Sequence, residues 1–406
     1  MAIIIRALRY NRGMKNTPLH RQFATFPDDT PRFNGQPIPL GGMSVQDFLK
    51  HYWHKKPLLI RNALPQFKAF FTPADALKAL QDEHVESRLI MQNDGWQMNS
   101  GPLRKKQMPT NKQKNWTALI QGVDMHNAHG HALLNLFRFI PDARLDDLMV
   151  SLAADGGGVG PHYDSYDVFL LQAHGRRRWQ IGAGQDLSLK PNMPLKILQN
   201  FEPTEEFILE AGDMLYLPPQ YAHDGVAVGD ECMTYSIGFR APTYREIGVA
   251  LLNFVEDNLE LEGRYADPKL KYQTTPAALP VQMVDDMYQN LQQMRWDKTW
   301  VAECLGCYLS EPKDSAWFAP NESLSLKQFI KAASKNGLVL APATKMLYYA
   351  PWVFINGEHL IAGGEDAVRL QQLANLRMSD AQFAADADIW AVLYEWFNAG
   401  WLCCGN

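Results

Sequence analysis

The pattern of residues between about 147 and 240 constrains the fold more than any other feature of the chain. Apolar residues occur there in short runs, and clusters of glycine, proline and aspartate separate the runs. Such a pattern predicts short β-strands. Several short strands joined by long, irregular links indicate a closed sandwich or barrel of the jelly-roll kind. We expect strands at residues 148–153, 166–173, 177–181, 207–210, 213–217 and 233–239.

Helical patterns lie on both sides of this region. Residues 44–53 form an amphipathic pattern with Ser44 as N-cap, followed by a short apolar strand at 56–61. At Thr243 the period becomes helical, because Thr243 and Glu246 form a capping box and an apolar stripe follows. That stripe consists of Ile247, Ala250, Leu251, Phe254 and Val255, and a second consists of Val284, Met287, Tyr288 and Leu291.

The rest of the chain divides into a tail and a terminal domain. Residues 1–43 read as a loose polar tail, 44–242 as the barrel domain, 243–310 as a helical region and 311–406 as a small α+β domain. The last of these has expected helices at 325–334, 365–376 and 380–398. An Asn356-Gly357 turn predicts a hairpin at 353–360. Helices with a hairpin indicate a winged-helix-like domain.

Composition excludes some classes of protein. The net charge of −5 argues against a chain that binds nucleic acid or an anionic membrane with its whole surface. The basic segment 104–114 is either a local patch or a solvated loop. No run of 18 apolar residues exists, so no membrane span is expected. Five cysteines indicate a reducing cytoplasm, and Cys304 and Cys307 have the spacing of only half a zinc site.

One motif points to a metal centre. In the stretch Gly-Gly-Gly-Val-Gly-Pro-His-Tyr-Asp, His162 and Asp164 are two residues apart, so both side chains can point to the same side of an extended segment. His223 follows later, after a turn and a strand. Two imidazoles and one carboxylate on one face of a metal form the facial triad of Fe(II) oxygenases, which leaves positions open for a co-substrate and O₂. The alternative is that both histidines cap loops.

A co-substrate such as 2-oxoglutarate needs a cation for its far carboxylate. In the run Arg176-Arg177-Arg178-Trp179, strand alternation places Arg177 on the face of Trp179, which should be buried. Arg177 is therefore the expected anchor, while Arg176 and Arg178 fit a solvated face. Ser151, on the strand before the glycine run, is a second candidate ligand for this carboxylate or a simple packing serine.

At these residues the sequence resembles the JmjC oxygenases, and within them the bacterial ribosomal oxygenases. The resemblance rests on Phe48-Leu-x-x-Tyr-Trp-x-Lys-Lys-Pro-Leu-Leu-Ile-Arg, Gly-Pro-His162-x-Asp164, Gly-Arg-Arg-Arg-Trp179 and Leu217-Pro-Pro-x-x-x-His223. It implies a cupin-like double-stranded β-helix barrel, then a helical dimerisation region and a winged-helix domain. The iron ligands fall on His162, Asp164 and His223, and the 2-oxoglutarate cation falls on Arg177. The tail before residue 44 departs from the family.

The resemblance also implies a function. Members use Fe(II), 2-oxoglutarate and O₂ to hydroxylate a ribosomal protein, and in bacteria the target is an arginine, at C3, of large-subunit protein sixteen. A homodimer in the cytoplasm is expected, with no membrane and no direct nucleic-acid partner. An arginine substrate needs an acid at the pocket rim. Asp155 and Asp167 flank the motif, and Asp155 is the better candidate, although it could equally form a turn before Gly156.

Other interpretations stay open. His126, His129 and His131 could form a second metal site, but exposed imidazoles at a helix–loop boundary fit better. The enzyme could be a cupin metal hydrolase or isomerase without 2-oxoglutarate, or an N-methyl-lysine demethylase of the JmjC group. The chain could also be a winged-helix binding protein with a non-catalytic barrel. The sequence does not separate hydroxylation from demethylation.

Overall fold

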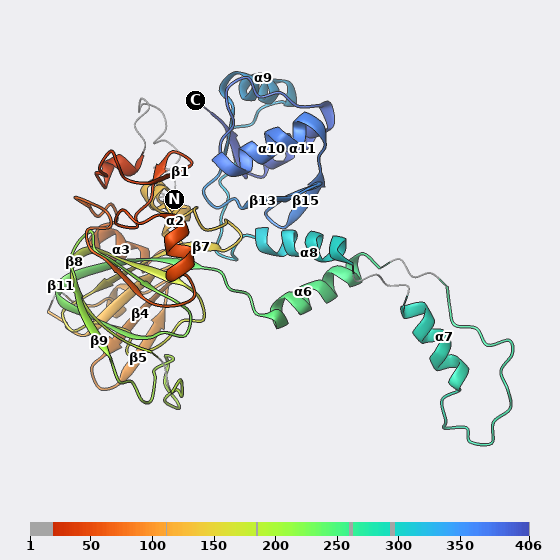
Figure 1. Cartoon of the computed structure of the whole chain (residues 1–406), viewed down its shortest axis with the longest axis horizontal. Helices are drawn as coiled ribbons and strands as arrows, with labels where there is room; N and C mark the ends of the chain where they lie inside the picture. The colour runs from red at the N-terminus through yellow and green to blue at the C-terminus, as the bar shows by residue number, and fades with distance from the viewer. Residues whose placement is uncertain (1–18, 111, 184–185, 260–262, 293–296, 406) are drawn as a thin grey trace. The chain divides into compact units, whose positions relative to one another are not determined.

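A computed structural model describes residues 19–110, 112–183, 186–259, 263–292 and 297–405 (Figure 1). The chain forms two compact units. The first contains the barrel, residues 312–344 and the C-terminal residues from 372. The second contains residues 242–311 and 345–371. Among the described residues, no helix is both long enough and apolar enough to cross a membrane.

The first unit is built on a nine-stranded sheet with strand order β3-β10-β8-β11-β7-β6-β4-β5, in which β9 also pairs with β8. All of the pairings are antiparallel. This antiparallel sheet agrees with the jelly-roll, cupin-like architecture that the sequence predicts. The strands are β3 (Leu58–Ile60), β4 (Ser87–Gln92), β5 (Trp96–Ser100), β6 (Trp116–Ile120), β7 (Leu145–Ala153), β8 (Val168–Gly182), β9 (Glu205–Leu209), β10 (Met214–Leu217) and β11 (Ala222–Phe239).

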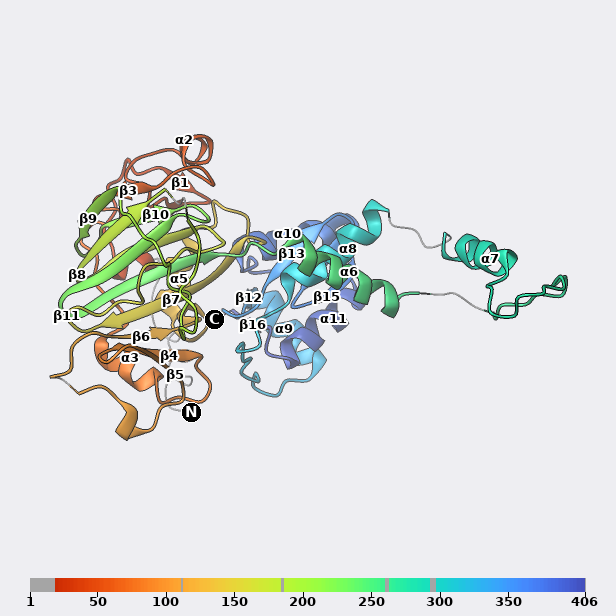
Figure 2. The ribbon, with the colours of Figure 1, turned by 90° about the horizontal axis from the view of Figure 1, so that it is seen from below.

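The two longest strands, β8 and β11, lie side by side and run through the whole barrel (Figure 2). The first half of β8 pairs with β10, and its second half pairs with β9. Between the halves, Gly175 has a φ of +64° and the β8–β11 register shifts. A residue in this left-handed region forms a bulge at little cost when it is glycine. The bulge changes the parity of β8, so even-numbered residues before it and odd-numbered residues after it face the barrel interior.

Two sequence predictions of strands are wrong in their extent. The segments 166–173 and 177–181 were expected as separate strands, but they belong to the single strand β8 because the bulge at Gly175 continues the ladder. The strand expected at 233–239 begins at Ala222 in the structure. Residues 222–228 contain Asp224 and Gly225, which are typical of turns, yet they pair with the second half of β8. Strands β4, β5 and β6 were not expected.

The outer surface of the sheet carries the largest core. Phe48, Phe169, Tyr216 and Tyr235 are fully buried there. Phe48 belongs to α2 (Val45–His51), whose expected N-cap Ser44 accepts a hydrogen bond from the Asp47 amide at 3.0 Å. The other helices around the sheet are α3 (Pro73–Ala79), α4 (Val123–His126) and α5 (Ala128–Asn135), with 3-10 turns η1 (Leu19–Gln22) and η2 (Lys105–Gln107).

The tail is not loose where it is described. Residues 1–18 lie outside the described residues, but Phe23, Ile38 and Leu40 are buried in the core of the barrel domain. The strands β1 (Arg32–Phe33) and β2 (Gln36–Pro37) form a small hairpin between them. The apolar residues of this segment are few and widely spaced, so no periodic pattern indicated their burial.

The second unit contains α6 (Tyr244–Asp257), α7 (Val281–Leu291), α8 (Lys298–Ser310) and a three-stranded sheet. The sheet consists of β13 (Met346–Tyr349), β14 (Trp352–Ile355) and β15 (Glu358–Ile361). Asn356 and Gly357 connect β14 to β15 with positive φ values of 47° and 90°, so the expected Asn-Gly hairpin is confirmed. The expected capping box of Thr243 and Glu246 is also present.

The first unit also contains the C-terminal helices and strands. They are α9 (Leu326–Asn336), β12 (Leu338–Leu340), α11 (Ala387–Asn398) and β16 (Leu402–Cys404), and α10 (Gly364–Leu376) leads into them. The last helix begins at 387 rather than at the expected 380, with Asp386 as its N-cap residue. All five cysteines are free, and none belongs to a group that could hold a metal among the described residues.

Candidate metal and co-substrate site

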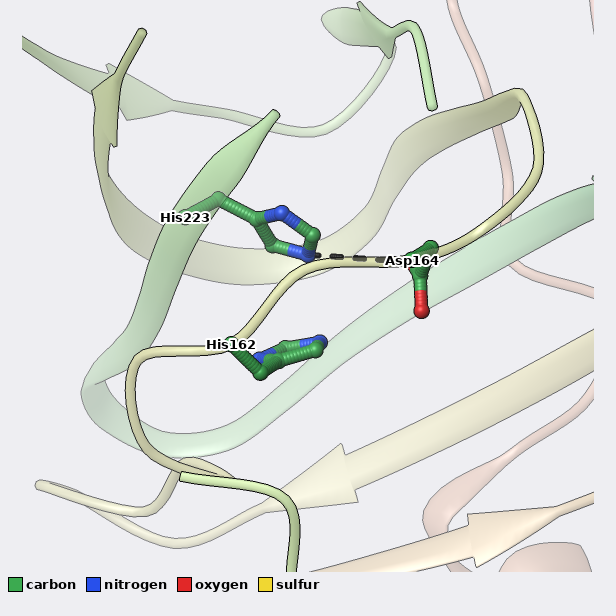
Figure 3. Close-up of side chains that lie close together, drawn as sticks. All are labelled: His162, Asp164 and His223. Carbon is green, nitrogen blue, oxygen red and sulfur yellow. Dashed lines mark ion pairs between the residues drawn. The ribbon is translucent and has the colours of Figure 1, made fainter. Parts of the chain in front are cut away.

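The three expected metal ligands converge in the structure. One ligand atom from each of His162, Asp164 and His223 lies within 4.8 Å of the others (Figure 3). The Nε2 atom of His223 is 3.8 Å from Oδ2 of Asp164, and the two imidazole centroids are 4.2 Å apart. Nitrogen and carboxylate donors in this arrangement suit a first-row divalent metal bound on one face. Within the described part of the chain, no other group of three such side chains meets the same criterion.

The glycine run before the motif explains how His162 reaches this position. Residues 156–162 lie beside the start of β11, where His162 and His223 exchange backbone hydrogen bonds of 2.8 and 2.9 Å. A Cβ atom at Gly157 would lie 2.2 Å from the Trp116 carbonyl oxygen, and one at Gly158 would lie 2.7 Å from the Gly225 carbonyl oxygen. Because any side chain at these two positions would collide with backbone, glycine is required for the close approach.

Hydrogen bonds fix the orientation of both imidazoles. Nδ1 of His162 lies 2.8 Å from the Gly160 carbonyl oxygen, and Nδ1 of His223 lies 2.9 Å from the Tyr221 carbonyl oxygen. Since a carbonyl can only accept, each Nδ1 carries the proton and each Nε2 keeps a lone pair for a metal. Burial, together with the neighbouring His162, lowers the pKa of His223 to about 4, so this ring is neutral. The Gln220 amide donates to the Asp164 carbonyl oxygen at 2.7 Å and holds the third ligand.

Arg177 is a buried cation with free donors. Its side chain is 4% exposed, whereas Arg176 is exposed and Arg178 is half-buried, as the expected alternation required. Its Nη1 donates to the Gly225 carbonyl oxygen at 3.0 Å. Its Nε and Nη2 are buried and have no acceptor among the described residues. A buried guanidinium with two unmatched donors is costly unless a carboxylate pairs with it in a fork geometry. The surroundings of Arg177 therefore fit the far carboxylate of a dicarboxylic acid.

Ser151 lies on the interior face of the barrel. It is opposite Thr234 of β11, which is in turn opposite Gln172 of β8. Gln172 is on the same face of β8 as Leu170, and Leu170 and Trp179 belong to one buried cluster. Ser151 thus shares the interior with Arg177. Its hydroxyl donates to the Thr234 carbonyl oxygen at 3.3 Å, and its role as a second ligand stays a prediction.

Gly225 is a part of the site that the sequence did not reveal, and it lies against Trp179, whose burial on the face of Arg177 was expected. The indole of Trp179 lies 5.8 Å from the His223 ring, centroid to centroid, and 5.7 Å from the Arg177 guanidinium carbon. A Cβ atom at Gly225 would lie 2.5 Å from the indole, so glycine is required opposite this tryptophan. The indole Nε1 is buried and lacks an acceptor among the described residues. The Asp-Gly pair directly after His223 was the sequence signal that could have identified Gly225, but this pair resembles a turn.

Asp155 lies where β7 ends and is half exposed. Its Oδ1 accepts from the Gly229 amide at 2.8 Å, and its Oδ2 lies 4.0 Å from Lys114 Nζ. Lys114 is held mainly by Asp230, at 2.8 Å. One carboxylate oxygen of Asp155 therefore orders the loop, while the other faces Lys114. The expected role of Asp155 in binding a substrate stays a prediction.

The other candidates do not form a site. Asp167 is fully buried rather than on a rim, and it accepts from the Tyr216 hydroxyl at 2.6 Å and pairs with His54 at 2.9 Å. The expectation of exposed imidazoles in the histidine cluster is wrong, because His126, His129 and His131 are half-buried in α4 and α5. Burial lowers the pKa of all three. The packing of α4 and α5 against the barrel accounts for the burial of these histidines.

Comparisons with known proteins agree with this geometry. A JmjC domain profile matches residues 132–247, and a ROXA-like winged-helix profile matches residues 293–403. Ribosomal protein uL16 3-hydroxylase from Escherichia coli is 33% identical over 366 residues, which cover 87% of this chain and 96% of the relative.

The chain belongs to the JmjC ribosomal-oxygenase family.

The structure of the E. coli ribosomal oxygenase YcfD in complex with cobalt and 2-oxoglutarate is 30% identical. It has a TM-score of 0.76, with 89% of this chain and 98% of that chain covered. A more distant relative, the bifunctional lysine-specific demethylase and histidyl-hydroxylase NO66 of Brugia malayi, is 36% identical over 28% of this chain and 18% of its own length. This member of the family is thus a 2-oxoglutarate-dependent oxygenase that uses Fe(II) and O₂. The Nε2 atoms of the two imidazoles and the Asp164 carboxylate fit the metal, and the unmatched donors of Arg177 fit 2-oxoglutarate.

Proposed function

We propose that this protein hydroxylates an arginine side chain, at C3, of ribosomal protein uL16. Two features support the proposal. The E. coli relative named as a uL16 3-hydroxylase is covered over 96% of its length. The second and decisive feature is the pair of unmatched Arg177 donors on the interior face that also carries Trp179 and His223. A metal hydrolase or isomerase without a dicarboxylate co-substrate has no use for a buried cation there.

In this proposal His162, Asp164 and His223 hold Fe(II), while Arg177 and Ser151 hold the far carboxylate of 2-oxoglutarate. With O₂, the bound iron supplies oxidative decarboxylation of 2-oxoglutarate to succinate and CO₂ and transfer of one oxygen atom to a substrate C–H bond. The protein orients the metal ligands and excludes water from the site. Gly160 and Tyr221 keep the histidine Nε2 atoms directed at the metal, and the apolar interior around Trp179 excludes water from the co-substrate.

Asp155 is the proposed contact for the substrate guanidinium. It is acidic, half exposed and directly before the glycine run that leads to His162. Among the described residues, the contact found for its Oδ2 is Lys114 at 4.0 Å, a distance too long for a strong hydrogen bond. An arginine of the substrate can take this position and form two charge-assisted bonds. Lys114 remains paired with Asp230 when this happens.

The test uses the purified full-length protein and a uL16 peptide. We expect the arginine to gain the mass of one oxygen atom in mass spectrometry, in step with succinate release. Replacing Asp164 with Ala should leave less than about a tenth of turnover, because the metal loses its charged ligand. A peptide with lysine in place of arginine should be a poor substrate, because it cannot form the two-pronged contact. Equal turnover of both peptides would remove the arginine assignment.

Two further measurements separate the remaining alternatives. The Asp155→Asn variant keeps an oxygen that can accept from Gly229, so the loop should stay ordered while peptide hydroxylation weakens. Decarboxylation of 2-oxoglutarate without peptide should continue in this variant. Formaldehyde release from an N-methyl-lysine peptide, with no oxygen added to the uL16 peptide, would instead indicate demethylation. The name of the B. malayi relative includes this activity.

We also propose a homodimer that forms through residues 243–310 and acts in the cytoplasm. Val281, Val284, Tyr288 and Leu291 of α7 are exposed and follow the three-and-four spacing of one helix face. Symmetric pairing is the commonest way to bury such a face. The cytoplasmic location follows from the proposed ribosomal substrate and the free cysteines.

A further inference from the structure

A cysteine, a histidine and a glutamate of the second unit form a chain of contacts that the oxygenase reaction does not use. Sγ of Cys307 lies 3.4 Å from Nδ1 of His359, and Nε2 of His359 lies 2.9 Å from Oε1 of Glu303. Cys307 and Glu303 are one helical turn apart on α8, and His359 belongs to β15. A nucleophile, a base and a carboxylate that orients the base, in this order, are the arrangement of nucleophilic catalysis.

Packing between α8 and the hairpin holds His359 in place. A Cβ atom at Gly306 would lie 2.3–2.4 Å from the ring of Phe354, so glycine at this position lets β14 lie directly on the helix. The Ser310 hydroxyl donates to the Cys307 carbonyl oxygen at 3.0 Å and accepts from the Gly357 amide at 3.1 Å. The turn that leads into β15 is therefore fastened to the helical turn that carries Cys307.

The hydrogen-bond directions assign the protons. The carboxylate of Glu303 can only accept, so His359 carries its proton on Nε2, and Nδ1 is left to accept from the thiol. Burial and the nearby Glu303 raise the pKa of Cys307 to about 11, so this residue rests as a thiol. It becomes a nucleophile when Nδ1 of His359 takes its proton. Glu303 then stabilises the imidazolium.

We propose that Cys307 is a modification site, a thiol activated by His359 and Glu303 that exchanges with cationic, low-molecular-weight disulfides. The Cys307 sulfur attacks one sulfur of the disulfide, the old S–S bond breaks and a mixed disulfide forms. The thiol proton passes to His359 and then to the departing thiolate, so no further oxidant is needed. Glu303 and Glu311 make the surroundings acidic, which favours a positively charged partner over an anionic one.

The chain provides its own matched control. Cys404 is half-buried like Cys307, and burial raises its pKa to about 11 as well. No histidine is among the contacts found for Cys404 in the described part of the chain, and its titratable neighbour is the thiol of Cys403. Burial and pKa are therefore similar at the two thiols, and the base is the difference between them. A comparison of the two needs no substitution at all.

The experiment incubates the folded wild-type protein with cystamine at neutral pH and follows each cysteine by peptide mass spectrometry. We expect mixed disulfide at Cys307 to form about tenfold faster than at Cys404, or more, because a positioned base accelerates proton transfer. Glutathione disulfide, which is anionic, should show a smaller preference for Cys307. Equal rates at the two cysteines would overturn the proposal, and an equal or larger preference with glutathione disulfide would overturn the cationic specificity.

Substitutions then assign the roles. His359→Gln should lower the rate at Cys307 to that of Cys404. Glu303→Gln keeps an acceptor for Nε2 and should retain more of the rate than Glu303→Ala, as expected of a residue that positions the base. Thermal melting confirms that each variant is folded. A rate at Cys307 that is unchanged in a folded His359→Gln variant would remove the histidine from the mechanism and overturn the proposal.

Discussion

Arg177 combines three properties that rarely occur together in one side chain: it is charged, it is buried, and two of its donors lack acceptors among the described residues. Such a group is stabilised only when a ligand supplies the missing acceptors. Its neighbour Arg178 carries the same charge, but alternation turns it to the outer face of β8, where it is half-buried. The two residues therefore form a natural pair for mutagenesis.

Arg177→Met should raise the KM for 2-oxoglutarate much more than it changes metal affinity. Charge-assisted hydrogen bonds contribute about 1.5–3 kcal/mol, which corresponds to a factor of about 10–150. The measurement is succinate release as a function of 2-oxoglutarate concentration, with Mn(II) binding followed separately by calorimetry. Arg178→Met is the control and should change KM by less than about twofold. An unchanged KM in the Arg177 variant would place the co-substrate elsewhere.

At the scale of elements, the pairing of β8 with β11 determines which residues meet in the barrel. Gly225 lies opposite Trp179 in this ladder, and the indole occupies the space of the missing side chain. Gly225→Ala should therefore lower the free energy of unfolding by about 1–3 kcal/mol through overpacking. It should also displace Trp179 from His223.

Chemical denaturation measures the first effect, and tryptophan fluorescence on metal binding reports the second. Gly238→Ala, on the same strand, is the matched control, since the nearest atom to its added Cβ would be 3.7 Å away. Equal stability of the Gly225→Ala and Gly238→Ala variants would contradict the overpacking at Gly225.

A second element-scale prediction concerns Asp124 of α4. Its Oδ1 accepts from the Leu148 amide at 2.8 Å, and burial, together with Asp147, raises its pKa to about 7. Because the folded state holds this proton more tightly than the unfolded state, the contribution of Asp124 to the free energy of unfolding is greatest at low pH. It falls as the pH rises from about 4 to about 7, by at most about 1.4 kcal/mol per pH unit.

Asp124→Asn keeps the acceptor for Leu148 but cannot titrate. The decrease in melting temperature between about pH 5 and pH 7 should be smaller in this variant than in the wild type. All other titrating groups are common to the two proteins, so the difference isolates Asp124. Parallel melting profiles would show that the carboxyl does not titrate in this range.

Local patterns predicted the elements whose signals lie in a few neighbouring residues. Examples are the Ser44 cap, the Asn356-Gly357 hairpin and the alternation that buries Arg177. The start of β11 was missed because Gly225 and its acidic neighbours resemble a turn. The physical reason for this glycine is the ring of Trp179, which is distant in sequence. The partners of Asp167, which are His54 and Tyr216, are likewise distant, so no local pattern could separate a buried network from a rim acid.

At the scale of the whole molecule, the exposed apolar face of α7 predicts self-association. Val284 and Tyr288 lie one turn apart on this face. Val284→Asp places a charge at its centre and should convert a dimer into a monomer at micromolar concentration, as measured by analytical ultracentrifugation. Gln289→Asp adds the same charge away from the face and should leave the dimer intact. A wild-type chain that sediments as a monomer would contradict this proposal.

The bulge at Gly175 leaves β8 and β11 as one continuous ladder on which both ends of the site are mounted. His223 pairs with Ile181, and Ala227 pairs with Arg177, so the proposed metal ligand His223 and the position of Arg177 are four residues apart, about 13 Å along the strands. Neither can slide without breaking ladder hydrogen bonds. The two strands thus fix the distance between these two positions. If His223 holds the metal and Arg177 the far carboxylate, this fixed spacing should select the length of the keto diacid, and we expect oxaloacetate, one carbon shorter than 2-oxoglutarate, to be a poor co-substrate.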